Sequence, residues 1–357
     1  MKKRIIISLL CIAVMALLPL IAVTNTDSDL KTKNSSQKND VSDTSSRQSE
    51  NISEKEENTQ TSSESSVQTV AEDKYFKILD EDTGNIIEVD DRTFCYGAVA
   101  AEMMPSFEQE ALKAQCVACY THFCRLREQQ RSNPDSSLGG ADFSAKLSEN
   151  QYYMTEDTMK KSWGNLYDES IKNIKTAVDS VFGEVLTDND GKLIMVAYHA
   201  VSGGATEDSA DVFGQKVSYL QAVASPGDLA APGYLSECTV SEKDFKNKIL
   251  AENKNADLSK NADKWIGKSE KTNSGTVKTI KIGGEEFSGA KIREIFGLRS
   301  ANFDVSYKDG NFEFTVRGYG HGVGMSQYGA EYMAQQGADY REILSWYYQG
   351  VKIEKYS

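Results

Sequence analysis

Residues 317–330 read Arg-Gly-Tyr-Gly-His-Gly-Val-Gly-Met-Ser-Gln-Tyr-Gly-Ala, the most distinctive stretch of the chain. Four glycines alternate with other residues from Gly318 to Gly324, and a helical pattern begins near Ser326. The stretch lacks the G-x-x-x-x-G-K-[ST] pattern of a phosphate-binding loop, and it fails the G-x-G-x-x-G pattern at the third glycine. Packing alone hardly explains glycine at this density beside His321. The stretch therefore predicts a strand-to-helix turn that holds a ligand.

A second turn of small residues lies upstream, where residues 198–208 read Tyr-His-Ala-Val-Ser-Gly-Gly-Ala-Thr-Glu-Asp. Gly203 and Gly204 would let a ligand approach the backbone closely. Ser202 and Thr206 offer hydrogen bonds to sugar-like hydroxyl groups. An ordinary tight turn explains the same residues equally well.

Glu102 is the candidate for acid–base chemistry. It follows four small or apolar residues, 98–101, and comes shortly before Pro105. A carboxyl group on an apolar segment between two elements is expected to have a raised pKa, which suits a general acid. The alternative is that Glu102 caps a helix or pairs with Lys113 or Arg125.

The cysteines of residues 116–119 are predicted to lie on the buried face of a helix. A helix is predicted over residues 106–127, opened by a capping box of Ser106 and Gln109. Its buried stripe consists of Leu112, Cys116, Cys119, Phe123 and Leu126. Free cysteine on such a stripe behaves as a small hydrophobic residue. A metal site that also uses His122 and Cys124, or a disulfide, is the alternative.

The remaining hydrophobic patterns mix strands and helices without regular alternation. Strands are predicted over residues 75–79, 184–186, 193–198, 276–282 and 312–316. Further helices are predicted over residues 157–163, 169–181, 241–250, 289–296 and 327–336. Such an order predicts the α+β class, as a single mixed domain of one or two lobes with a substrate cleft. The polar run 254–274 is predicted to be an exposed insertion.

Charge and the N-terminal pattern limit the function further. The chain has 40 Lys and Arg against 53 Asp and Glu, a net charge of −13, which argues against nucleic-acid binding. Residues 1–23 combine a basic flank with an uncharged run, which predicts a transmembrane anchor with the rest of the chain outside the cytoplasm. A cleaved signal peptide is the alternative. Residues 24–73, polar and without aromatics, predict a disordered tether, and residues 74–357 the folded domain.

Residues 76–354 resemble the stage II sporulation protein D family of peptidoglycan lytic transglycosylases and the related amidase-enhancer proteins. The most specific matching run is Gly-His-Gly-Val-Gly-Met-Ser-Gln-Tyr-Gly-Ala, at residues 320–330. The resemblance rests on the content and order of residues 100–115, 198–214, 219–228, 318–337 and 340–353.

The resemblance implies that Glu102 is the catalytic acid, cleaving the bond between N-acetylmuramic acid and N-acetylglucosamine with formation of a 1,6-anhydro product. It implies no cofactor. It suggests substrate contacts from Lys113, Gln151, Tyr153, Tyr198, Ser202, Gly203, Gly204, His321, Gly322, Ser326, Gln327 and Tyr328. The competing hypothesis is a non-catalytic, glycan-binding enhancer of a cell-wall amidase, which would not need Glu102 as an acid.

Two departures from the family pattern stand out. Tyr120 occupies the position of an arginine in the first family helix, which puts one contact of the site in question. Some clostridial relatives bind zinc through cysteine and histidine in the following segment. Here those positions hold Ser144, Glu149 and Asn150, so no zinc is expected there.

The resemblance also implies a biological setting. The expected location is the mother-cell membrane, with the catalytic domain facing the engulfed forespore. The expected substrate is glycan strands stripped of stem peptides. The expected partners are a cell-wall amidase and a membrane scaffold of the engulfment machinery.

Overall fold

The computed structural model describes residues 75–356. The predicted anchor and tether lie outside the described residues. Within residues 75–356, no helix is both long and apolar enough to cross a membrane. Helices and small sheets alternate irregularly along this part of the chain, which confirms the α+β class.

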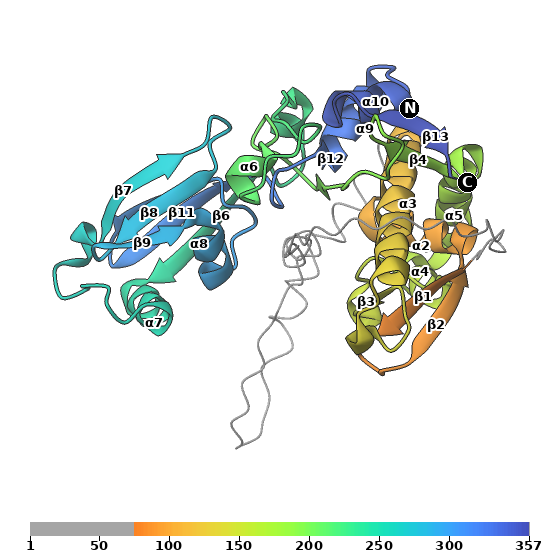
Figure 1. Ribbon diagram of the computed structural model, residues 1–357. Helices are drawn as coiled ribbons and strands as arrows, with labels where there is room; N and C mark the ends of the chain where they lie inside the picture. Colours follow the sequence, from red (N-terminus) through yellow and green to blue (C-terminus); the bar gives the residue numbers. More distant parts are fainter. Residues whose placement is uncertain (1–74, 357) are drawn as a thin grey trace, which may run out of the picture. The chain divides into compact units, whose positions relative to one another are not determined.

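The first of two hydrophobic cores surrounds α3 (Gln109–Ser132), a helix of 24 residues. Cys116 and Cys119 are fully buried on it, which confirms that both belong to the core. Figure 1 shows α3 running through the middle of a group of helices. It packs against α2 (Asp91–Glu102), α5 (Tyr167–Val181), α9 (Gln327–Gln335) and α10 (Tyr340–Tyr347).

Short strands and one short helix complete this part. The helix is α4 (Glu156–Trp163). One sheet has the order β2-β1-β3, with β1 (Tyr75–Asp80), β2 (Ile86–Asp90) and β3 (Phe143–Ala145). Two further pairs are β4 (Glu184–Thr187) with β13 (Lys352–Lys355), and β5 (Tyr198–His199) with β12 (Met325–Ser326).

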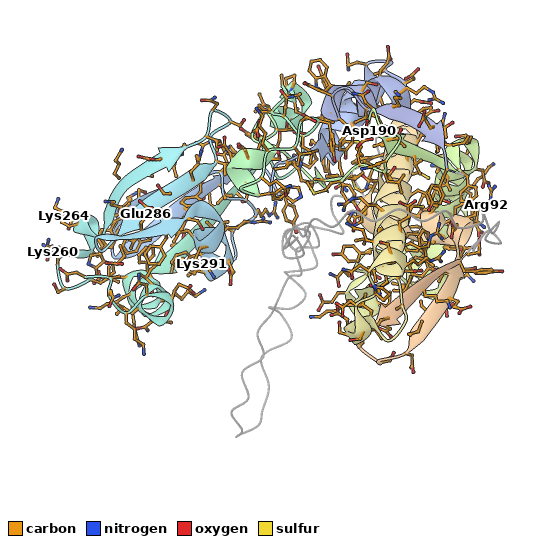
Figure 2. The ribbon with its side chains drawn as sticks, in the orientation of Figure 1. Arg92, Asp190, Lys260, Lys264, Glu286 and Lys291 are labelled. Carbon is orange, nitrogen blue, oxygen red and sulfur yellow. The ribbon has the colours of Figure 1, made fainter. Side chains whose placement is uncertain are left out.

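The second core lies between two three-stranded sheets and two helices. One sheet has the strand order β10-β11-β6 and consists of β6 (Leu235–Ser241), β10 (Phe303–Lys308) and β11 (Asn311–Arg317). The other has the order β7-β8-β9 and consists of β7 (Ile266–Lys271), β8 (Val277–Ile282) and β9 (Glu285–Ser288). The helices are α7 (Glu242–Glu252) and α8 (Gly289–Phe296). Phe245 and Phe312 stack at its centre, with ring centroids 3.8 Å apart. Lys260, Lys264 and Glu286 lie on the exposed surface of this part (Figure 2).

Residues 198–208 and 317–326 link the two cores along the chain, and backbone bridges join them at Val201–Tyr319 and Glu207–Val323. The short helix α6 (Ser209–Val212) follows the first of these segments. Gly324 has a φ of +71°, and a Cβ there would collide with the carbonyl oxygen of Ala197. Only glycine fits this close approach, which explains part of the glycine pattern.

The structure corrects several sequence expectations. The helix α2 was not predicted, and α3 begins at Gln109 rather than at 106. The N-cap of α3 is Glu108, which makes no side-chain capping bond, so the predicted capping box is wrong. In residues 193–198 only Tyr198 belongs to a strand. The run 254–274 is not a wholly exposed insertion, because it contributes β7 and the buried side chain of Trp265 to the second core.

Candidate active site

Glu102 is the last residue of α2, and Met103, which follows it, still belongs to the first core. Asp90 caps the start of α2 by accepting a hydrogen bond from Thr93 N, and the buried face of α2 fixes its direction. Glu102 thereby meets two other elements. The Nε2 atom of Gln327, the first residue of α9, donates to Glu102 Oε2 at 3.3 Å. The hydroxyl of Tyr198 in β5 is the second hydrogen-bond partner.

The environment of Glu102 shifts its proton affinity as expected. Burial raises the pKa of Glu102 to about 7, against the smaller lowering effects of the hydrogen bonds from Gln327 and Tyr198. Cys119 of α3 faces the same group, and its Sγ lies 3.6 Å from the Tyr198 hydroxyl. A carboxyl group with a pKa near 7 can both give and take a proton at neutral pH.

The basic residues proposed as alternative partners of Glu102 lie elsewhere. Lys113 Nζ forms an ion pair with Glu110 at 2.6 Å. Arg125 reaches Gln129 at 3.4 Å. Neither cation affects the pKa of Glu102, so the pairing explanation of Glu102 is wrong.

Asp228 ties the two glycine-containing turns together. It lies fully buried in the 3-10 helix η5 (Pro226–Ala230). Its Oδ2 accepts hydrogen bonds from the backbone N (3.0 Å) and the hydroxyl of Ser202, and its Oδ1 accepts from the Ser326 hydroxyl at 2.7 Å. Both serines were expected to contact substrate, but in this structure they are buried and bonded to Asp228. Asp228 ends one of the family-matching segments, residues 219–228, but no pattern in the sequence gives it a role of its own.

His321 lies in a small polar pocket between the same turns. The pocket is lined by Val201, Ser202, Gly203, Ala205, Glu207, Thr276, Ser300, Asn302, Arg317, Gly320, His321 and Gly322. His321 Nδ1 accepts from Val323 N at 3.1 Å, so its Nε2 carries the proton when the ring is neutral. Burial lowers the pKa of His321 well below its usual value, which keeps the ring neutral. The pocket thus combines a neutral imidazole with the buried carboxyl group of Glu207.

The other predicted contacts fall in two places. Tyr328 packs edge-on against Phe107, with ring centroids 5.1 Å apart, one residue beyond Gln327. Gln151 is buried and accepts from Lys146 N at 2.9 Å. Tyr153 stacks on Phe94 at 5.6 Å in the first core. Tyr153 therefore packs against α2, while the side chain of Gln151 bonds within its own loop.

Tyr120, at the family arginine position, also points away from Glu102. Its hydroxyl donates to Asp91 Oδ2 at 2.8 Å, at the opposite end of α2. Arg127 binds the same carboxylate through two nitrogen atoms, at 2.8 and 3.0 Å. The tyrosine is part of a buried ion-pair network that fixes the start of α2.

The residues at the family zinc positions do not fit a zinc site. Ser144 donates to Glu81, and Glu149 pairs with Lys146 at 3.5 Å. Asn150 completes a turn with a φ of +55°. Serine and amide side chains are poor zinc ligands. Across residues 75–356, no three His, Cys, Asp or Glu side chains come together as a metal site would require.

Comparison with known proteins gives a consistent set of relatives. A family model described as stage II sporulation protein matches residues 80–187. The stage II sporulation protein D of Bacillus amyloliquefaciens is 35% identical over 263 residues, which cover 73% of each chain. That of Bacillus subtilis is 35% identical over 262 residues, 73% of this chain and 74% of the relative. The amidase enhancer of Bacillus subtilis is 27% identical over 73% of this chain and 40% of its own length.

Proposed function

We propose, since this chain belongs to the stage II sporulation protein D family, that it is a peptidoglycan lytic transglycosylase with Glu102 as its general acid. The single observation that carries the proposal is the setting of Glu102. It is a carboxyl group at the junction of α2, β5 and α9, with a pKa raised to about 7 by burial and with uncharged hydrogen-bond partners.

The proposed reaction needs one carboxyl group. Hydrolytic glycosidases use two carboxyl groups, one as acid and one to activate water or attack the sugar. In a lytic transglycosylase the acid protonates the glycosidic oxygen, and the bond from C1 of N-acetylmuramic acid to that oxygen breaks. The departing N-acetylglucosamine keeps a 4-hydroxyl group. The C6 oxygen of the muramic residue then bonds to C1, and its proton passes to the carboxylate.

Glu102 suits both halves of this cycle. It returns to the protonated form at the end, so no water and no second acid are consumed. The hydrogen bonds from Gln327 and Tyr198 stabilise its ionised form between the two proton transfers. Nearby turns that carry Gly203, His321 and Gly322 are proposed to bind the sugar hydroxyl groups.

A second candidate function is enhancement of a separate cell-wall amidase through glycan binding. The similarity to the amidase enhancer of Bacillus subtilis favours it. Product analysis separates the two hypotheses. Purified, peptide-stripped glycan strands are incubated with the full-length chain, and the products are analysed by mass spectrometry. Glycan ends that carry 1,6-anhydro-N-acetylmuramic acid would support the transglycosylase hypothesis. Absence of such ends, together with stimulation of an added amidase, would support the enhancer hypothesis.

The pH dependence of cleavage should report the state of Glu102. A general acid must be protonated in the free enzyme, so kcat/KM should fall as pH rises through the pKa of about 7. Well above that midpoint, each further pH unit should lower kcat/KM about tenfold. The measurement is the initial rate of anhydro-end formation across pH 5 to 9. A flat profile over this range would mean that another group donates the proton.

The location is also a proposal. We place the domain outside the cytoplasm on a retained N-terminal anchor, where it would act on the wall between mother cell and forespore beside an amidase and a membrane scaffold. Protease added to intact mother-cell membranes oriented outside-out should release the folded domain. Fractionation supplies the control, because a chain that is already soluble before proteolysis would rule out the retained anchor.

A further inference from the structure

Asp228 holds both elements that supply hydrogen bonds to Glu102. Its Oδ1 accepts from Ser326, and the next residue, Gln327, donates to Glu102. Its Oδ2 accepts from Ser202, which lies four residues beyond Tyr198, the other partner of Glu102. Asp228 is fully buried. A buried carboxyl group is costly unless its oxygens are well paired, and here three donors satisfy it.

We propose that Asp228 is a positioning residue, which fixes Ser202, three residues after β5, and Ser326, at the end of β12, so that Tyr198 and Gln327 meet the carboxyl group of Glu102. This role deepens the proposed function and rests on it, because positioning matters only if Glu102 is the acid. The geometry itself does not depend on the reaction.

Ser326 makes the link rigid on the α9 side. Its Oγ caps α9 by accepting from Gly329 N at 3.2 Å, while its hydroxyl proton goes to Asp228. Ser326 also ends β12, which pairs with β5 so that it lies opposite His199. A shift of Ser326 would therefore move both the first residue of α9 and the β5–β12 pair. The 3.3 Å hydrogen bond from Gln327 to Glu102 has little slack for such a shift.

The titratable groups near this chain of contacts are few among the described residues. Tyr198 from β5 and Cys119 from α3 face Glu102. His199 and Tyr347 are influenced by Asp228. None of these groups replaces the donor that Gln327 provides.

The test measures the titration of Glu102 directly. The full-length chain is labelled with glutamate carrying ¹³C in its side-chain carboxyl group, and the Glu102 signal is identified by its loss in Glu102→Gln. Loss of the Gln327 hydrogen bond should raise the pKa of Glu102, because that bond favours the ionised form. Gln327→Leu sets the scale of the effect, because it should raise the pKa of Glu102 by roughly one pH unit. Asp228→Asn and Ser326→Ala should shift the midpoint in the same direction.

Two comparisons separate positioning from general damage. Ser209→Ala removes a buried hydroxyl that accepts from Val217 N at 2.8 Å and bonds to neither Asp228 nor Glu102, and it should leave the midpoint unchanged. Ser326→Ala combined with Gln327→Leu should shift the midpoint no further than Gln327→Leu alone. If Asp228→Asn does not fold, Ser326→Ala decides alone.

An unchanged Glu102 midpoint in the folded Asp228→Asn or Ser326→Ala protein would overturn the positioning role. Failure of the proposed function has a different signature. In that case the wild-type chain would form no anhydro ends, while the midpoint shifts would still occur. If the enzyme is active, the pH at which kcat/KM falls should shift to higher values in these variants, together with the titration midpoint of Glu102.

Discussion

Glu102→Gln is expected to lower the rate of anhydro-end formation by about 10²–10⁴-fold, the usual contribution of a general acid. Glutamine keeps the size of the side chain and most of its hydrogen bonding to Gln327 and Tyr198, but it has no proton to transfer. Glycan binding should therefore persist while cleavage is lost. The rate is followed by mass spectrometry of the products, and binding by co-sedimentation with purified glycan.

Glu331→Gln is the matched control for this substitution. Glu331 lies on α9, is partly buried, and also has a pKa raised by burial. Its carboxylate accepts from Glu108 N at 2.7 Å rather than facing the Glu102 site. Its substitution should change the rate by less than about threefold. Near wild-type cleavage by Glu102→Gln would place the acid elsewhere in the chain.

Arg127→Met is expected to lower the free energy of unfolding by about 3–5 kcal/mol, the cost of leaving a buried charge without its partner. Arg127 binds Asp91 through two nitrogen atoms and lies 4.2 Å from the centre of the Phe76 ring. Methionine preserves much of the packing volume but leaves Asp91 with only the Tyr120 hydroxyl. Denaturant unfolding of the full-length chain, followed by tryptophan fluorescence, measures the loss.

An exposed ion pair provides the comparison. Arg92 of α2 binds Asp179 of α5 at 2.6 Å, and both side chains are exposed. Figure 2 labels Arg92. Because solvent screens this pair, Arg92→Ala should cost only about 0–1 kcal/mol. Equal losses in the two variants would show that the Asp91–Arg127 pair is not a special anchor of α2.

Sequence periodicity predicted the parts of the site that depend on local pattern. Cys116 and Cys119 fall at helical spacing with Leu112 and Phe123, and all four are buried. Glu102 follows a run of small apolar residues, and the structure accordingly raises its pKa. Both inferences rest only on the residues adjacent in the sequence, and both agree with the structure for that reason.

Contacts between distant segments were beyond sequence reasoning. Asp228 has no local signal, since its three donors come from Ser202 and Ser326, 26 and 98 residues away. Lys113 was expected near Glu102, yet it pairs within its own helix. Trp265 sits in a highly polar run, and only the second core, assembled from several strands and helices, explains its burial.

The separation of Glu102 and Gln327 has a consequence for biosynthesis. The two residues that meet in the site are 225 positions apart, and Gln327 belongs to one of the last helices of the chain. Chains grow at about 5–20 residues per second, so the first half of the site waits at least ten seconds or so for the second. A chain interrupted before α9 keeps Glu102 and Tyr198 but lacks the hydrogen bond from Gln327. The arrangement around Glu102 would thus be complete only once α9 has been made, so a partly made chain should lack the Glu102–Gln327 contact.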